Sequence, residues 1–237
     1  MKLDSQKKLF QNQFNQMAKY YDFLEPVPLF LHKLILKKCS SKKDDFLEIG
    51  CGTGRLLNLV SPRYKKTVAV DFSKEMINIA KKRINKNITY FNISASEIQF
   101  EDEQFDFVVC NALFHHLSND KKELIKVLKK IKKILRPGGR IFISDFVAFK
   151  LFRNLSDWVH YVYVIYNSVR KGKFNFYSEL KKEPEIYRTH LKSERGMFFT
   201  RKEFMKIFGD VFENSKINFI GKRRKIISMY YLIWDKK

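Results

Sequence analysis

Cysteine, proline and glycine are scarce in this sequence, and long apolar runs are absent. Its 237 residues include three cysteines, Cys39, Cys51 and Cys110, which form no CxxC pair. We therefore predict neither a disulfide scaffold nor a metal site, and a reducing compartment. Five prolines and nine glycines form no linker between large domains. With no run of about eighteen apolar residues and no apolar stretch of a signal peptide, we expect a cytoplasmic protein without a membrane-spanning helix.

Acidic residues are also few beside basic ones. Lys and Arg number 47 against 25 Asp and Glu, which gives a formal net charge of +22. This balance favours an anionic partner such as RNA, DNA, a lipid headgroup surface or an acidic metabolite. Because Lys, Ile, Asn and Phe are abundant throughout, compositional drift explains the charge equally well. The 45% of hydrophobic residues provide a sizeable core for one large domain, or one domain with a subdomain.

Short apolar runs alternate with amphipathic stretches in the middle of the chain. Strands are predicted at 46–49, 67–70, 88–91, 105–110 and 140–144. The clearest helix between them is 119–135, where apolar residues recur at three- and four-residue spacing. This alternation is typical of βαβ units, and so predicts an α/β fold with a parallel sheet. Runs at 217–220 and 226–234 predict a C-terminal antiparallel hairpin.

A glycine-rich turn follows the first predicted strand. Gly50, Gly52 and Gly54 alternate in the stretch 46–55, where the missing Cβ atoms let backbone amides approach a ligand closely. The dinucleotide fingerprint would need a small residue in place of Arg55, and the phosphate loop G-x-x-x-x-G-K-[ST] is absent. The turn therefore indicates a nucleoside-cofactor site that does not suit a pyrophosphate or triphosphate.

Two carboxylates accompany this turn. Glu48 precedes the glycines, where it would stabilise a cationic ligand and repel a pyrophosphate. Asp71 ends the second predicted strand, at the sheet edge where a carboxylate can accept both hydroxyls of a ribose. Alone, Asp71 is compatible with any ribosyl cofactor. Together with the glycine pattern it indicates a specific cofactor site.

These motifs resemble those of the class I S-adenosylmethionine-dependent methyltransferases. The resemblance covers about residues 15–146 and rests on Glu48–Gly54, Asp71, Phe105–Asp106 and Leu135–Gly139. It implies a Rossmann-like, mostly parallel seven-stranded sheet with a C-terminal antiparallel hairpin and helices on both faces. It also implies S-adenosyl-L-methionine as the cofactor, and cofactor-binding roles for Tyr21, Glu48, Gly50, Cys51, Gly52, Asp71, Phe72, Met76, Ser94, Ala95 and Asn111.

The resemblance also distributes roles over the bound cofactor. Glu48 and the backbone at Gly50 and Gly52 would hold its methionyl portion, and Asp71 its ribose. Phe72 and Met76 would pack on the adenine, Ser94–Ala95 replaces the family's usual Asp-Ala step at the adenine edge, and Asn111 would line the sulfonium end. Residues 17–22 are similar to a segment of the small-molecule subgroup that includes the quinone and sterol methylases, in which Tyr21 would lie near the cofactor. Packing of Tyr21 on the core explains it equally well.

Two histidines after the fourth predicted strand are candidates for a general base. His115 and His116 lie near the predicted sulfonium end, and histidine has a suitable intrinsic pKa for proton removal. A packing and capping role is the alternative for both. The Asn/Asp-Pro-Pro-Tyr element of amino-directed methylases is absent at 111–114, and Cys110 is interpreted as a buried apolar residue rather than a nucleophile.

We expect residues 1–40 to form an N-terminal helical cap and residues 41–237 a methyltransferase domain. The aromatic and basic insertion 147–199 is predicted to form a lid over a small aromatic, apolar or anionic acceptor. Alternatives are an RNA methyltransferase, a quinone or lipid-precursor methylase at a membrane surface, and a non-catalytic binding subunit of the same fold. The sequence leaves the oligomeric state open.

Overall fold

The computed structural model describes residues 2–24, 29–38, 45–84, 87–117, 121–148, 199–220 and 227–237. In chain order its elements are α1 (Lys2–Met17), η1 (Ala18–Tyr20), α2 (Tyr21–Leu24), α3 (Leu29–Lys38), β1 (Asp45–Ile49), α4 (Arg55–Val60), η2 (Ser61–Arg63), β2 (Lys66–Val70), α5 (Lys74–Arg83), β3 (Thr89–Phe91), η3 (Ala95–Glu97), β4 (Phe105–Asn111), η4 (Phe114–His116), α6 (Lys121–Lys133), β5 (Leu135–Ala148), α10 (Arg201–Val211), β6 (Lys216–Ile220) and β7 (Ile227–Asp235). The predicted lid over 147–199 lies almost wholly outside these residues.

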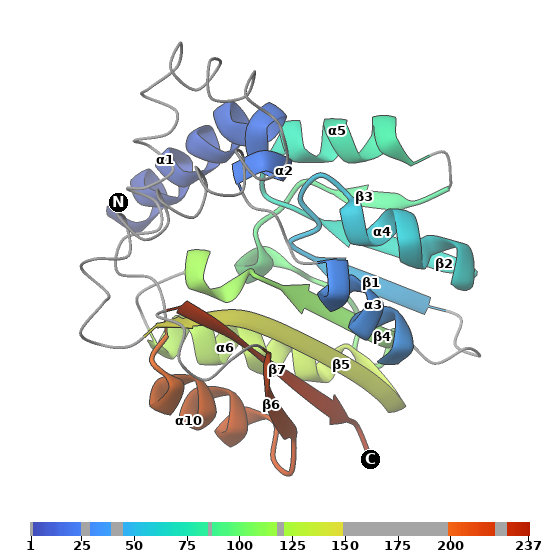
Figure 1. The fold of residues 1–237 in the computed structure, drawn as a ribbon, viewed down its shortest axis with the longest axis vertical. Helices are drawn as coiled ribbons and strands as arrows, with labels where there is room; N and C mark the ends of the chain where they lie inside the picture. The colour runs from blue at the N-terminus through green and yellow to red at the C-terminus, as the bar shows by residue number, and fades with distance from the viewer. Residues whose placement is uncertain are drawn as a thin grey trace.

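One seven-stranded sheet organises the chain, in the order β3-β2-β1-β4-β5-β7-β6 (Figure 1). Strands β1 to β5 pair in parallel, whereas β7 pairs antiparallel with both β5 and β6. The predicted Rossmann-like α/β fold with a C-terminal antiparallel hairpin is therefore confirmed.

Helices cover both faces of the sheet. Successive side chains of a strand point to opposite faces, so each central strand contributes apolar side chains to both. On one side, Leu47 and Ile49 of β1 share an apolar cluster with α6 and α10. On the other side, Phe46 of β1 packs in a second cluster with α3 and α4. This burial on both faces explains why the central strands are nearly continuous apolar runs.

The helix α6 and the strand β5 differ from their predicted bounds. Periodicity predicts a helix over 119–135, whereas α6 spans Lys121–Lys133 and residues 118–120 lie outside the described part. The predicted strand 140–144 is part of the longer β5. It begins early because Leu135 pairs with Phe105 of β4, across an irregularity in register, and it extends to Ala148 because β7 pairs along it. Neighbouring strands, which the local pattern does not reveal, set its length.

The N-terminal helices dock at two separate places. Phe14 and Met17 of α1 form a small apolar cluster with Met76 of α5. Leu31 and Ile35 of α3 instead pack in the cluster that contains α4. Among the described helices, none is long and apolar enough to cross a membrane.

Candidate functional site

A cavity of about 430 Å³ lies where β1, β2 and β4 end. This is the carboxyl edge of the parallel strands, where open α/β sheets bind their ligands. Twelve of the thirteen residues singled out from the sequence line it, and they come from six stretches of chain. They are Tyr21, Glu48, Gly50, Cys51, Gly52, Asp71, Phe72, Met76, Ser94, Ala95, Asn111 and His116. The thirteenth, His115, is not among the lining residues.

The glycine turn after β1 has a backbone that larger residues would strain. Gly50 and Gly54 have φ values of 78° and 77°, in the left-handed region. A Cβ atom at Gly54 would lie 2.9 Å from the Cβ of Ala80 on α5, and one at Gly50 would lie 2.9 Å from a methyl carbon of Leu113. Glycine here lets the turn approach both the neighbouring helix and the loop after β4.

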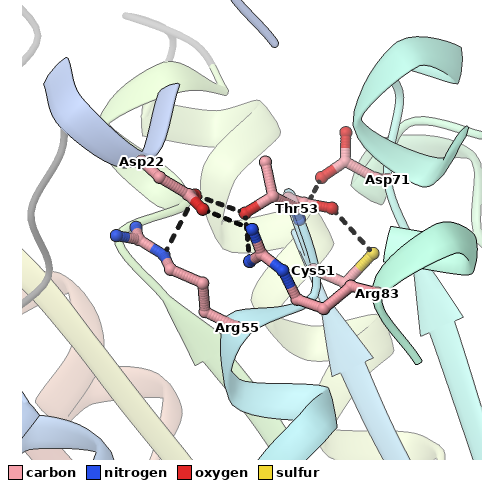
Figure 2. A network of polar contacts seen from close by, with 7 residues as sticks. Asp22, Cys51, Thr53, Arg55, Asp71 and Arg83 are labelled. Carbon is pink, nitrogen blue, oxygen red and sulfur yellow. Dashed lines mark hydrogen bonds and ion pairs between the residues drawn. The ribbon is translucent and has the colours of Figure 1, made fainter. Parts of the chain in front are cut away.

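Asp71 fixes the glycine turn from the end of the next strand. Its Oδ2 accepts a hydrogen bond from the Gly52 amide at 2.8 Å (Figure 2). Its Oδ1 accepts one from the Ser73 amide at 2.9 Å. Burial raises the pKa of Asp71 from its usual 3.8 to about 6, against the lowering effect of these two hydrogen bonds. Each carboxylate oxygen has a second lone pair, so the group can still accept hydrogen bonds from a ligand.

Glu48 lies at the cavity as a buried carboxyl group. It is 3% exposed, and its Oε2 has no hydrogen-bond partner within the described part of the chain. Burial raises the pKa of Glu48 well above its usual value, the charge of Asp71 adds to this, and Arg55 acts in the opposite direction. A buried polar atom without a partner is rare because it costs free energy. This one is suited to a ligand that donates a hydrogen bond or carries positive charge.

Aromatic and hydroxyl side chains also line the cavity. The ring of Phe14 from α1 meets Phe72 edge-on at 5.1 Å between centroids. Gln11 and Asn92 donate hydrogen bonds to the Phe72 carbonyl at 2.6 and 2.9 Å, which fixes the loop that carries this ring. The Ser94 hydroxyl accepts a hydrogen bond from the Ser96 amide and caps η3.

The two candidate histidines have different surroundings. His115 is 3% exposed, and its Nδ1 lies 2.6 Å from Oδ1 of Asp145 at the end of the parallel region of β5. Asp145 also accepts hydrogen bonds from the amides of Phe114 and Phe146, each at 2.7 Å, so it fixes the turn after β4. The ring of His116 contacts that of His115 in a tilted arrangement, with 3.8 Å between centroids, and lines the cavity. Of the two, only His116 faces the site.

Asn111 and Cys110 end β4 with different roles. Asn111 lines the cavity while its Oδ1 accepts a hydrogen bond from the Ser144 hydroxyl at 2.7 Å. Cys110 is fully buried in the apolar core, as the sequence predicts, and burial raises the pKa of its thiol well above the usual value. A thiol in this state is a poor nucleophile.

Three residues at or near the cavity were not singled out from the sequence. His32 of α3 lines the cavity at 5% exposure, and its pKa is lowered to about 4 by burial and then by Arg55. Asp22 lies beside the glycine turn, where it accepts a hydrogen bond from the Thr53 hydroxyl at 2.5 Å (Figure 2). Asp145 holds His115. Asp22 ends the segment 17–22 that resembles the small-molecule subgroup, but no motif marks His32 or Asp145, which only tertiary packing brings to the site.

Asp22 joins the N-terminal segment to the glycine turn through two arginines. Arg83 of α5 donates to Asp22 at 2.5 Å and to the Thr53 hydroxyl at 3.1 Å, and Nε of Arg55 lies 3.4 Å from the same carboxylate. Figure 2 shows these side chains converging on Asp22 from α4, α5 and the turn. The described residues hold no group of three or more His, Cys, Asp or Glu side chains arranged to bind a metal ion.

The strand order, the glycine turn after β1 and the acid at the end of β2 together define a class I S-adenosylmethionine-dependent methyltransferase. The chain belongs to this family of enzymes, whose methyl donor is S-adenosyl-L-methionine. The family model described as a methyltransferase domain matches residues 47–143, the stretch from β1 into β5.

Individual relatives resemble this chain over different lengths. A malonyl-[acyl-carrier protein] O-methyltransferase of Priestia megaterium is 31% identical over 146 residues, which cover 59% of this chain and 52% of the relative. The alignment thus spans about half of that protein. A ubiquinone/menaquinone biosynthesis C-methyltransferase of Wigglesworthia glossinidia brevipalpis is 23% identical over 89% of this chain and 91% of its own.

Solved structures share the fold at lower identity. Phosphoethanolamine N-methyltransferase 2 of Haemonchus contortus, in complex with S-adenosyl-L-methionine, superposes with a TM-score of 0.63. It is 13% identical, over 94% of this chain and 57% of that chain. At 13% identity, this similarity is evidence for a shared fold alone.

Proposed function

We propose that this enzyme transfers the methyl group of S-adenosyl-L-methionine to a small-molecule acceptor, at oxygen, nitrogen or carbon. The observation that carries the proposal is the cavity, in which the unpartnered Oε2 of Glu48 and the turn-fixing Asp71 lie within one wall. When bound, the cofactor supplies an electrophilic methyl group on a sulfonium. The protein must align the acceptor for in-line displacement and, for a hydroxyl or a carbon acid, remove a proton.

The cavity residues suit the parts of this cofactor. Glu48 would accept a hydrogen bond from the methionyl ammonium, with the backbone of Gly50, Cys51 and Gly52 alongside, and Asp71 would accept from the ribose hydroxyls. Asn111 would line the sulfonium end. The remaining residues would enclose the adenosyl portion: Tyr21, Phe72, Met76, Ser94 and Ala95.

His116 is our proposed general base. It lines the cavity beside Asn111, at the end where the methyl group would be transferred. His115 would act through it, because Asp145 fixes the ring that His116 contacts. Acceptors without an acidic proton would not need this step.

Named relatives act on different acceptors, so their names do not select one. Their names specify O-methylation of a malonyl group on a carrier protein, C-methylation in quinone biosynthesis and N-methylation of phosphoethanolamine. We propose the insertion 147–199 as the lid over the acceptor, on the domain of residues 41–237. A quinone or lipid-precursor acceptor at a membrane surface is a special case of this proposal.

An RNA acceptor is the second candidate, and one surface feature favours it. The helix α6 carries seven lysines and one acid, Glu123. The buried face of this helix is apolar, and five of its lysines are exposed: Lys121, Lys122, Lys126, Lys129 and Lys133. A solvated amphipathic helix has the same pattern.

Thermal unfolding with cofactor tests the main proposal. S-adenosylmethionine and its demethylated product, S-adenosylhomocysteine, should each raise the unfolding temperature of the wild type, because each binds only the native state. Asp71→Ala should abolish this shift. Incubation with labelled cofactor and cell extract, separated into RNA, lipid and metabolite fractions, should then label the metabolite fraction. A wild-type protein unaffected by both compounds would contradict the proposal.

A further inference from the structure

Two polar side chains that take no part in the glycine turn share the cavity wall. His32 lies in the first part of α3, and Arg55 opens α4. Since α3 packs against α4, the two helices bring these side chains to the cavity together. Neither residue belongs to the pattern by which the sequence indicates a cofactor.

Arg55 presents one side of its guanidinium to the protein and leaves the other for a ligand. Its Nε lies 3.4 Å from Oδ1 of Asp22, whereas its terminal nitrogens point away from that carboxylate (Figure 2). Those terminal nitrogens make no hydrogen bond within the described ranges. The side chain is 22% exposed and lines the cavity. A guanidinium edge of this kind suits a carboxylate, which it binds through two parallel hydrogen bonds.

His32 adds a second donor beside this cation. It is 5% exposed and makes no hydrogen bond to any other residue that the structure describes. Burial and the Arg55 charge favour its neutral form, in which the ring keeps one N–H donor. A neutral donor avoids the repulsion that a second positive charge would suffer here.

Donors and an acceptor therefore occur together in this part of the cavity. Arg55 and His32 can donate to an anion, and the unpartnered Oε2 of Glu48 can accept from a cation. An α-amino acid group carries both charges two bonds apart, and one end of S-adenosylmethionine is such a group.

We propose that Arg55 and His32 bind the methionyl carboxylate of the cofactor, and that Asp22 is a positioning residue that aims the guanidinium. This assignment rests on the proposed function, because it concerns the same cavity. It distinguishes Arg55 from Arg83, which contacts the same Asp22 and also the Thr53 hydroxyl but does not line the cavity.

Calorimetric binding of two nucleosides separates the carboxylate from the rest of the cofactor. S-adenosylhomocysteine carries the amino acid group, whereas 5′-methylthioadenosine has the same adenosine and sulfur but lacks it. Arg55→Met should weaken the binding of S-adenosylhomocysteine at least tenfold. The affinity for 5′-methylthioadenosine should stay within twofold of wild type. His32→Leu and Asp22→Asn should each weaken S-adenosylhomocysteine by a smaller factor, again without affecting 5′-methylthioadenosine.

Matched variants make every outcome informative. Arg83→Met removes a guanidinium from Asp22 and Thr53 but none from the cavity, so any loss of affinity should be similar for the two nucleosides. Arg55→Lys keeps the charge without the two-pronged geometry and should be intermediate, and it serves in place of Arg55→Met if that variant unfolds. Equal loss of both nucleosides in the Arg55 variants would overturn the assignment. Unchanged affinity for both nucleosides would also overturn the assignment. In that case Arg55 and His32 would be free to bind an anionic group of the acceptor. A wild type that binds neither nucleoside would instead refute the proposed function.

Discussion

At the scale of single residues, Asp71 and Glu48 are two carboxyl groups whose ionised forms are destabilised by burial. Both carboxyl groups are buried beside one ligand cavity, and burial is the main cause that raises each pKa. Asp71 recovers part of this cost through two backbone hydrogen bonds, whereas Glu48 has an oxygen without a described partner. A ligand that donates hydrogen bonds to both carboxyl groups would offset the free-energy cost of burying them.

Stability without ligand should therefore fall as pH rises. An acid whose pKa is raised by folding binds its proton more tightly in the native state than in the unfolded state. Its contribution to the free energy of unfolding is therefore complete at a pH below the pKa of the unfolded state, and it is lost as the pH rises through the pKa of the folded state. For Asp71 that window runs from 3.8 to about 6. Across that window the free energy of unfolding should fall by an amount on the order of 3 kcal/mol.

Urea unfolding at a series of pH values measures this effect. The free energy of unfolding of the wild type, relative to Asp71→Asn, should decrease between pH 4 and pH 7. A difference that is constant over that range would show that Asp71 does not titrate as its burial implies.

Gly54 offers a second residue-scale prediction. Gly54→Ala should destabilise the protein by roughly 2–4 kcal/mol, because it combines a left-handed backbone with overpacking against Ala80. Gly138→Ala is the matched control: its φ is 72°, but nothing lies within 4 Å of the added Cβ, so only the backbone cost of about 1–2 kcal/mol remains. Equal midpoints in urea for the two variants would contradict the close contact of the turn with α5.

At the scale of elements, local signals and neighbouring elements act together. Thr200 and Glu203 form a capping box at the start of α10: the Thr200 hydroxyl accepts from the Glu203 amide, and the Glu203 carboxylate accepts from the Thr200 amide. The helix then packs Phe204 and Phe208 onto the sheet, far along the chain from the glycine turn.

Removal of this cap should affect stability alone. Thr200→Ala should lower the free energy of unfolding by about 1 kcal/mol, since the amides of the first turn lose an acceptor. The affinity for S-adenosylhomocysteine should be unchanged, as α10 does not line the cavity. Calorimetry and urea unfolding of the same variant separate the two quantities, and weaker binding in this variant would imply a link between α10 and the cavity.

Elements with strong periodicity were predicted well, and their ends less well. The apolar spacing in α6 and the β-branched run in β2 depend on their own residues, and both elements form where expected. The length of β5 depends on pairing with β4 and β7, which are distant in sequence. In the same way, the glycines and Asp71 have local signals, whereas His32 joins the cavity only through the docking of α3.

At the scale of the whole molecule, the net charge of +22 needs a test that separates RNA recognition from general attraction. For a small-molecule enzyme we expect only weak RNA binding, lost between 50 and 200 mM salt, with no methyl transfer to the RNA. Replacement of Lys126, Lys129 and Lys133 by Ala should reduce this binding, because these lysines are exposed on α6. The same variant should retain its affinity for S-adenosylhomocysteine. RNA methylation, or binding that resists salt, would favour the second candidate.

The sequence alone determined the alternation of strands and helices, the hairpin at the C-terminus and the glycine turn with its two carboxylates. These follow from hydrophobic period and from residue types whose backbone and charge act locally. Only the tertiary structure decided which side chains face the cavity: it brought His116 to the wall and held His115 behind it on Asp145, although the two are adjacent in sequence. Side-chain direction depends on hydrogen bonds between strands β4 and β5 and their loops, and such contacts form only when distant segments pack together.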